Sequence, residues 1–295
     1  MRQATWVNIG TDLRGMTNIQ EILTKAKLDY EVSKQPIYLA DGTEIHNKVA
    51  TVKNTGEYIG VVSPSYEIYQ NQEAFDFIDQ IPDIKFEKAG ETQKGLVYVI
   101  GKLPETTVLN DTFTPYVIFQ TSHNGLYNLR ATITPLRMVC QNQFSMSFKK
   151  MSNNVIIRHS RQLQSKIKQA QDLINQTASY MAEFNNTAEE LAALRINKTS
   201  VYGIIDRFFE ETKKNMTERK EKALNDRKEE FIRCYESDDN IDFRGTAWGM
   251  VNALTDYTTH KTRKKTQNIA ESSFMKVTFD TVTVPRLLEV IRETV

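Results

Sequence analysis

The dipeptide Asn124-Gly125 lies between two apolar, β-rich runs, and this arrangement constrains the fold more than any other feature of the sequence. The first run is Tyr116–Phe119 and the second is Leu129–Thr134. Asn-Gly supplies the two positive φ values of a type I′ turn, which joins antiparallel strands. Because alternate residues of a strand face opposite sides, we expect an apolar face with Tyr127, Leu129, Ala131 and Ile133, and a polar, basic face with Asn128, Arg130, Thr132 and Thr134.

The hairpin lies in a stretch, residues 112–171, that contains no Asp or Glu. It does contain eight basic residues, namely Arg130, Arg137, Lys149, Lys150, Arg158, Arg161, Lys166 and Lys168. Removing these eight from the 38 basic residues of the chain leaves 30 against 37 acidic ones, a net charge of −7. An ordinary solvent-facing surface mixes both signs of charge. The acid-free stretch therefore predicts a polyanionic partner.

The residue types in this stretch are those that bind nucleic acid. Arg and Lys bind phosphates, Asn and Gln bind base edges, and aromatic rings stack on bases. We predict phosphate contacts from Arg130, Arg137, Lys149, Lys150, Arg158, Arg161 and Lys166. We predict polar contacts from Asn124, Gln141, Asn142 and His159, and a stacking contact from Tyr127. Neither a metal nor a cofactor is required for this kind of binding.

Two features of the same stretch have alternative interpretations. Phe144 and Phe148 are four residues apart, so they are either core residues of a helical turn or stacking platforms. His159 either caps the following helix or contacts a ligand. A further acid-free run, residues 260–265, is either a second polyanion contact or a loop.

The composition is that of a globular protein rather than a disordered one. The chain has 295 residues, of which 40% are hydrophobic, enough for one large domain or two of ordinary size. Its two cysteines, Cys140 and Cys234, are far apart and lack metal-ligand spacing, which argues against a disulfide framework or a zinc site. The sequence has neither a stretch long enough to span a membrane nor a signal-peptide core. We expect a soluble protein in the cytoplasm of the host cell.

The pattern of elements predicts an α+β fold with two domains. Residues 1–160 are expected to form an antiparallel sheet of hairpins, five to seven strands with helices on one face. Thr17 is a candidate N-cap for the first helix. Turns are expected at Asp41-Gly42 and at residues 54–57, a helix at 72–81 that ends before Pro82, and strands at 84–89 and 95–103.

Residues 161–295 are expected to form a mostly helical domain. Apolar residues recur at helical spacing from Leu163 onward, which predicts an opening helix of about seven turns. Further helices are predicted at 188–194, 200–213, 217–235 and 245–261. The mixed charges of residues 217–230 are typical of a solvated helix face.

The sequence contains little that indicates catalysis. It has no phosphate-binding loop ending in Gly-Lys-Ser/Thr, no paired His on a helix with a Glu, and no Gly-x-Ser-x-Gly elbow. Asp238, Asp239 and Asp242 are close in sequence, and a metal-dependent nuclease could use such a cluster. Their neighbours Ser237 and Asn240 favour a loop between helices instead. We therefore favour a protein that is not an enzyme and binds no cofactor.

Several short motifs resemble a known family, in order and over nearly the whole chain. They are 36–38, 60–62 with Tyr66, 70–71 with 74–75, 122–125, 134–142, 157–159, 245–249, and 252–253 with Thr255. Together they resemble the phage/plasmid-like protein family described as domain of unknown function 932. The segment Thr134–Asn142 is the most specific of them, whereas Trp6–Thr11 departs from the family's usual Gly-Trp-His start. The resemblance implies a phage or mobile-element setting and no established mechanism.

These observations lead to a functional hypothesis with two alternatives. A sheet of hairpins followed by a long helix with a basic seam is similar to single-strand annealing recombinases of the RecT and Redβ type. We therefore expect a nucleic-acid-binding protein that anneals single strands and assembles into oligomers. The first alternative is a counter-defence inhibitor that binds a host defence protein complex. The second is the metal-dependent nuclease.

Overall fold

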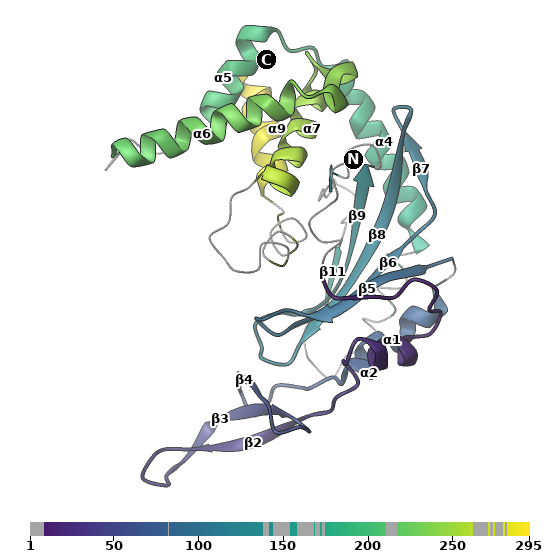
Figure 1. Ribbon diagram of the computed structural model, residues 1–295, viewed down its shortest axis with the longest axis vertical. Helices are drawn as coiled ribbons and strands as arrows, with labels where there is room; N and C mark the ends of the chain where they lie inside the picture. Colours follow the sequence, from purple (N-terminus) through teal and green to yellow (C-terminus); the bar gives the residue numbers. More distant parts are fainter. Residues whose placement is uncertain are drawn as a thin grey trace.

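A computed structural model describes most of the chain, namely residues 9–81, 83–137, 142–143, 154–157, 168, 172, 175–210, 217–261, 271, 274, 280 and 282–295. The molecule is elongated and curved, with a small sheet at one end, a main sheet in the middle and helices at the other end (Figure 1). Strands in the N-terminal half and helices in the C-terminal half confirm the α+β class. The domain boundary at residue 160 lies outside the described residues and stays a prediction.

The main sheet is antiparallel and runs in the order β1-β5-β6-β8-β9-β10, with β7 on β8 and β11 on β9. Its strands are β1 (Thr11–Asp12), β5 (Lys85–Glu91), β6 (Leu96–Lys102), β7 (Thr106–Val108), β8 (Asp111–Ser122), β9 (Leu129–Arg137), β10 (Asn142–Gln143) and β11 (Asn154–Ile157). The two runs that flank Asn124-Gly125 form the long central pair β8 and β9, as predicted.

A second, smaller sheet consists of β2 (Val32–Tyr38), β3 (Glu44–Lys53) and β4 (Tyr58–Val62) in sequential order. Both predicted hairpins are present. They belong to a sheet of their own, whereas the sequence predicted a single sheet of five to seven strands. The reason is the connection after β4, where a loop and a helix lead to β5 in place of a tight turn.

Ten helical segments or turns have defined bounds. They are α1 (Ile19–Lys25), α2 (Asn71–Phe75), the 3₁₀ helix η2 (Asp76–Gln80), α4 (Thr177–Ala193), α5 (Lys198–Phe208), α6 (Glu218–Tyr235), the 3₁₀ helix η3 (Asp238–Phe243), α7 (Ala247–Asp256), the π-helical turn η4 (Tyr257–Lys261) and α9 (Thr283–Thr294). The start of the long helix predicted from Leu163 lies outside the described residues, and α4 overlaps only the C-terminal part of the predicted range. The helix predicted at 188–194 is the last part of α4, because Ala188 continues its buried stripe.

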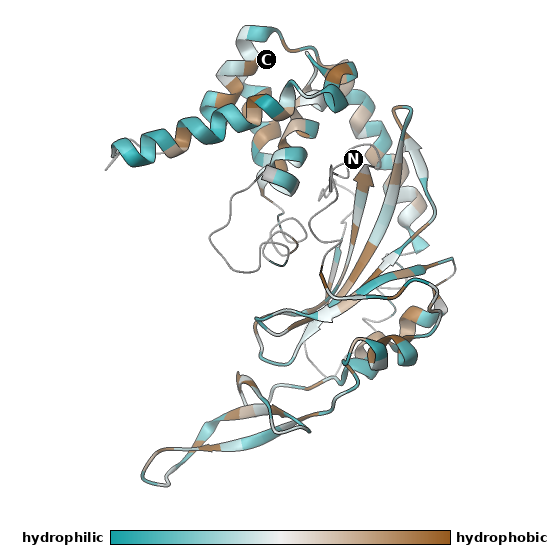
Figure 2. Ribbon diagram, viewed as in Figure 1, coloured by the Kyte–Doolittle hydropathy of each residue, from teal (hydrophilic) through white to brown (hydrophobic). Residues whose placement is uncertain are grey.

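Local capping explains where several helices begin. Thr217 caps α6, and its hydroxyl accepts a hydrogen bond from the backbone N–H of Lys220. The first helix is capped by Asn18, whose Oδ1 accepts from Glu21 N at 3.1 Å, so the prediction of Thr17 as its N-cap was wrong. Figure 2 shows that α6 is hydrophilic along most of its length, as expected for a solvated helix.

One face of the main sheet is covered by helices at both ends, in a single buried cluster. Phe77 of η2 packs edge-on against Phe119 of β8, with ring centroids 5.5 Å apart. Nearer the other end of β8, Phe113 contacts Phe184 of α4 at 5.4 Å, and Phe184 contacts Trp248 of α7 at 5.8 Å. Burial of such rings is a large part of the apolar area that stabilises the fold. Helices on one face of the sheet were predicted and are confirmed.

The opposite face is not the open polar surface that the sequence predicted. Thr132 and Thr134 of β9 are buried there, at 1% and 2% exposure. A second apolar cluster lies beside them on neighbouring strands, with Tyr98, Ile118 and Tyr116 among its members. The alternation of β9 correctly assigns its apolar face, but it does not reveal that the threonine face is also covered.

Candidate functional site

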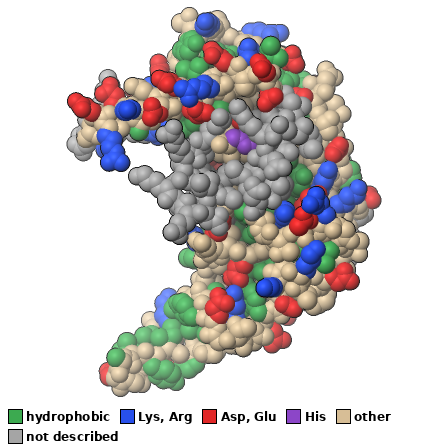
Figure 3. Space-filling view, viewed as in Figure 1, with side chains coloured by type: hydrophobic (Ala, Val, Ile, Leu, Met, Phe, Trp, Pro, Cys, Tyr) green, Lys and Arg blue, Asp and Glu red, His purple; other side chains and the backbone are tan. Residues whose placement is uncertain are grey.

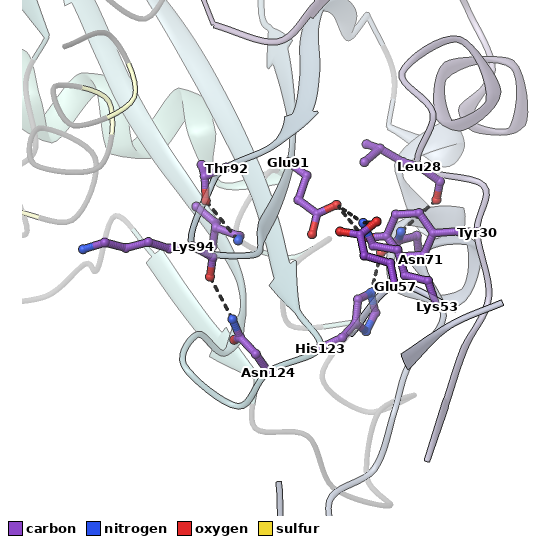
Figure 4. Close-up of polar contacts among 11 residues, drawn as sticks. Leu28, Tyr30, Lys53, Glu57, Asn71, Glu91, Thr92, Lys94, His123 and Asn124 are labelled. Atoms are coloured by element: carbon purple, nitrogen blue, oxygen red, sulfur yellow. Dashed lines mark hydrogen bonds and ion pairs between the residues drawn. The ribbon is translucent and has the colours of Figure 1, made fainter. Parts of the chain in front are cut away.

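A groove of about 880 Å³ lies where three connections meet. They are the β3–β4 turn, the β5–β6 turn and the loop between β8 and β9, residues 123–128 (Figure 4). The groove is lined by residues of both the small sheet and the main sheet. It contains two of the residues that the sequence predicted as contacts, Asn124 and Tyr127.

The β8–β9 loop is held by its own side chains. Ser122 Oγ donates to the carbonyl of Tyr127 at 2.8 Å and accepts from its N–H at 3.1 Å, which closes the loop at its base. Asn124 Oδ1 accepts from Leu126 N at 3.0 Å. Gly125 has φ 72°, but Asn124 does not share the positive φ.

The predicted type I′ turn at Asn124-Gly125 is therefore wrong, because such a turn needs two positive φ values. The amide of Asn124 is committed to tertiary contacts, and six residues separate the two strands. The two-residue turn with positive φ at both positions occurs at Leu109-Asn110, between β7 and β8.

Asn124 fixes the loop against both other walls of the groove. Its Nδ2 donates to the carbonyl of Lys94 at 2.8 Å. Gly60 of β4 and Gly95 of the β5–β6 turn both face its side chain. A Cβ on Gly60 would lie 2.6 Å from Asn124 Cβ, and one on Gly95 would lie 2.7 Å from its Nδ2. Real Cβ atoms do not approach neighbours so closely, so the close fit requires glycine at position 60, and at position 95 the φ of 74° favours glycine as well.

A buried hydrogen bond connects the same loop to α2. His123 is 1% exposed, and its Nε2 lies 2.9 Å from Asn71 Oδ1. Because Asn71 Nδ2 donates to the carbonyl of Leu28 at 2.8 Å, its Oδ1 is the acceptor and His123 Nε2 is the donor. This network assigns a proton to Nε2 of His123.

Beside His123 lies a cluster of charged and aromatic groups at the base of the small sheet (Figure 4). Lys53 Nζ lies 3.1 Å from Glu91 Oε2 and 3.1 Å from Glu57 Oε2, and its side chain is only 11% exposed. The ammonium also lies over the ring of Tyr30, 4.4 Å from its centroid. Tyr30 donates its hydroxyl to Glu91 Oε2 at 3.1 Å. The cluster therefore ties β3 to β5, one strand from each sheet.

The pKa shifts in this cluster favour a structural role. Burial acts to lower the pKa of Lys53, but its hydrogen bonds to Glu91 and Glu57 outweigh burial, and the pKa is raised. Burial and the Glu91 carboxylate raise the pKa of Tyr30 well above its ordinary value. Both groups keep their protons at neutral pH, so neither is poised as a general base. The arrangement is suited to holding the two sheets together rather than to proton transfer.

The remaining predicted contact residues are only partly described. Arg130 is half-buried on β9, opposite Gln120 of β8, and burial lowers its pKa. The backbones of Arg137 and Asn142 pair with each other between β9 and β10, but their side chains are not described. The others lie outside the described residues, namely Gln141, Lys149, Lys150, Arg158, His159, Arg161 and Lys166.

Sequence reasoning missed the polar centre of the site. Tyr30, Lys53, Asn71 and Glu91 come from four separate segments, and no local pattern connects them. One signal was present, because the motif segments 70–71 and 122–125 each carry one partner of the Asn71–His123 contact. Proximity between two motifs cannot be read from their sequence separation.

The aspartates proposed for a nuclease do not form a metal site. Asp238, Asp239 and Asp242 are exposed on η3. In the described part of the chain, no three His, Cys, Asp or Glu residues are grouped so that they could hold a metal ion. The structure thus gives the nuclease alternative no support.

Comparisons with known proteins identify a family and no function. No curated protein and no solved structure matches the chain. The similarity to annealing recombinases therefore stays a prediction. Across the described ranges, no helix combines the length and apolar character needed to cross a membrane. The model of one family, described as domain of unknown function (DUF932), matches residues 58–277, a range that includes β4, all of the groove lining except Lys53 and Glu57, and the helices from α4 to η4. The chain belongs to this DUF932 family.

Proposed function

We propose that the protein binds single-stranded nucleic acid along the groove and catalyses no reaction, in a phage or mobile-element setting. The observation that carries this proposal is the composition of the groove wall. Asn124 and Tyr127 lie there beside Lys94 and Tyr58. Proteins that hold single strands combine aromatic rings for the bases with cations for the backbone.

The aromatic part of the groove is accessible. Tyr58 is 61% exposed, and Tyr127 is half-buried. Bases of any sequence can stack on such rings, and each stack contributes about 1–3 kcal/mol. The groove thus offers two positions for bases of an unpaired strand, which a duplex with stacked bases could not reach.

The polar part of the groove contains one cation that is available to a phosphate. Lys53 is neutralised by Glu57 and Glu91. Lys94 is exposed and makes no ion pair with any residue in the described ranges. The loop itself carries no Lys or Arg, but the acid-free stretch supplies the positive charge of Arg130 on β9, the strand that follows the loop. This charge favours a polyanion over a neutral ligand.

Fluorescence anisotropy with a labelled single-stranded oligonucleotide, with a matched duplex alongside, tests the proposal at two salt concentrations. Wild type should bind the single strand in preference to the duplex, and more weakly at higher salt. Tyr58→Ala should weaken binding about 5- to 150-fold, the equivalent of one lost stack. Lys94→Ala should weaken binding and reduce the salt slope by about one.

Two exposed residues outside the groove are matched controls. Tyr38→Ala removes a ring that is 57% exposed, and Lys48→Ala removes an exposed charge on β3. Both should bind as wild type does. Absence of binding at low salt would defeat the proposal and leave the binding of a host defence protein as the function to pursue.

A further inference from the structure

The small sheet carries an unusual number of exposed apolar side chains. Tyr38, Leu39, Tyr58 and Val61 are 57%, 51%, 61% and 45% exposed. The sheet projects from the body of the molecule, and apolar side chains gather over it in the space-filling view (Figures 1 and 3). Apolar side chains that gather on an exposed surface indicate a site of interaction with another molecule.

The two outer strands of this sheet differ in how their edges are protected. The β2 edge has Lys34, whose Nζ donates to the carbonyl of Pro64 at 2.8 Å, together with Pro36 and a shift of register before Tyr38. Lysine, proline and irregular register are the usual means of blocking an edge strand. The β4 edge, Tyr58–Val62, has no charged residue and no proline. Among the strands that the structure describes, none pairs with this edge, which is thus open to another strand.

The backbone of β4 is available for pairing. In the described chain, its hydrogen bonds go to β3 alone, including the one that Gly60 O accepts from Thr51 Oγ1. Half of the backbone groups of an edge strand point outward, where they lack a strand partner. The β4 edge therefore offers N–H and C=O groups to a further strand.

The two faces of β4 are not equivalent. Tyr58 is opposite Val52, and Val61 is opposite Ala50. The register of the pair shifts between Thr51 and Val52, so the exposed Tyr58 and Val61 share one face although they are three residues apart. The other face packs on the β8–β9 loop, where Gly60 faces Asn124. One face is thus fixed to the body of the protein, and the other carries apolar side chains that water still contacts.

We propose that β4 pairs antiparallel with β4 of a second copy of this chain, about a twofold axis near Gly60. With the axis near Gly60, residue 61 of one copy lies opposite residue 59 of the other, so the two copies of a charged residue next to the axis would lie close together and repel each other. The β4 edge carries none. Pairing would join the two small sheets into one and bring Tyr58 and Val61 of both copies together. Because Tyr58 and Ile59 also line the groove, the grooves of the two copies would lie next to each other, but the pairing does not depend on the proposed function.

Sedimentation velocity over a range of concentrations, without nucleic acid, tests this pairing. Wild type should dimerise. Val61→Lys and Val61→Glu should each be monomeric, because the like charges of the two copies lie on either side of the axis and close to each other, and an equimolar mixture of the two should recover the dimer. Leu39→Lys adds the same charge to an apolar residue away from β4 and should leave the dimer intact. Circular dichroism checks that each variant is folded.

The outcomes separate the pairing from its alternatives. A wild type that stays monomeric at every concentration overturns the proposal. A dimer that persists in both Val61 variants, or a mixture that remains monomeric, shows that β4 is not at a twofold axis. Val61 does not line the groove. Oligonucleotide binding by monomeric Val61→Lys would therefore show that the groove functions without the dimer, so that each proposal can fail alone.

Discussion

His123 Nε2 lies 2.9 Å from Asn71 Oδ1, and this buried contact joins the loop between β8 and β9 to the first residue of α2. The two residues are 52 positions apart in sequence. The contact fixes one end of the loop whose other residues form a wall of the groove. Its integrity therefore determines whether the groove keeps its shape.

Replacing His123 by Ala should lower the free energy of unfolding by about 1–3 kcal/mol, because it leaves the oxygen of Asn71 buried without its donor. Urea denaturation followed by circular dichroism measures the change. His46→Ala is the control, since its side chain is 83% exposed, and it should change stability by less than about 0.5 kcal/mol. Equal effects of the two substitutions would show that the buried contact does not stabilise the fold.

Gly60→Ala should destabilise the protein by about 1–3 kcal/mol, because the new methyl group would overlap Asn124 and force the loop away from β4. Gly203 in α5 is a matched glycine with no atom within 4 Å of its added Cβ. Gly203→Ala should stabilise the protein by up to about 1 kcal/mol through helix propensity. Thermal unfolding of both variants checks the opposite signs. A neutral Gly60→Ala would contradict the close fit around Asn124.

The Lys53 cluster predicts a loss of stability at alkaline pH. The pKa values of Lys53 and Tyr30 are raised from ordinary values of 10.5 and 10.0. For both groups the folded protein holds the proton more tightly than the unfolded chain does. Their contribution is fully present below the ordinary values and falls as pH rises above them.

Urea denaturation between about pH 8 and pH 11 measures this slope, whose range is set by the ordinary pKa values. Tyr30→Phe keeps the ring over Lys53 and removes the hydroxyl, so stability should fall less steeply above about pH 10. Tyr58→Phe alters an exposed ring and should retain the wild-type slope. An unchanged slope in Tyr30→Phe would mean that its hydroxyl is not coupled to folding.

The C-terminal helix α9 should be essential for stability, although the sequence analysis did not predict it. Leu287 is fully buried, and Arg286 Nη2 donates to the carbonyl of Phe208 at 2.8 Å. Leu287→Ala should cost about 2–5 kcal/mol through loss of packing and the remaining cavity. Val282→Ala, at a residue 67% exposed, should cost less than about 0.5 kcal/mol. Similar denaturation midpoints for both variants would show that α9 is not part of the core.

Local signals predicted the elements that depend on local interactions. The charge pattern of α6 and its start near Thr217 were predicted, because the signals for both lie within the helix and its first turn. The failures occurred where tertiary contacts prevail. Asn124 was assigned to a tight turn, but its amide binds Leu126 N and the carbonyl of Lys94. The favourable local conformation of Asn-Gly was thus replaced by contacts from another hairpin.

The candidate site was only partly predictable for the same reason. The absence of acid in residues 112–171 drew attention to Asn124, Tyr127 and Arg130 through composition alone. No compositional signal of this kind points to Lys53 and Glu91, because an ion pair between separate strands leaves no periodic pattern in the sequence. The covered threonine face of β9 was likewise missed, since alternation distinguishes two faces without showing what packs on each.

Ultraviolet crosslinking of a single-stranded oligonucleotide that contains 5-iodouracil, followed by mass spectrometry of the peptides, most directly tests where the strand lies. Stacking in the groove predicts crosslinks to Tyr58 and Tyr127, which are two of the residues that line it. Tyr58→Phe should retain the first crosslink and Tyr58→Ala should lose it. Crosslinks confined to peptides outside residues 53–62, 91–95 and 122–128 would contradict the account, because the strand would then bind elsewhere on the molecule.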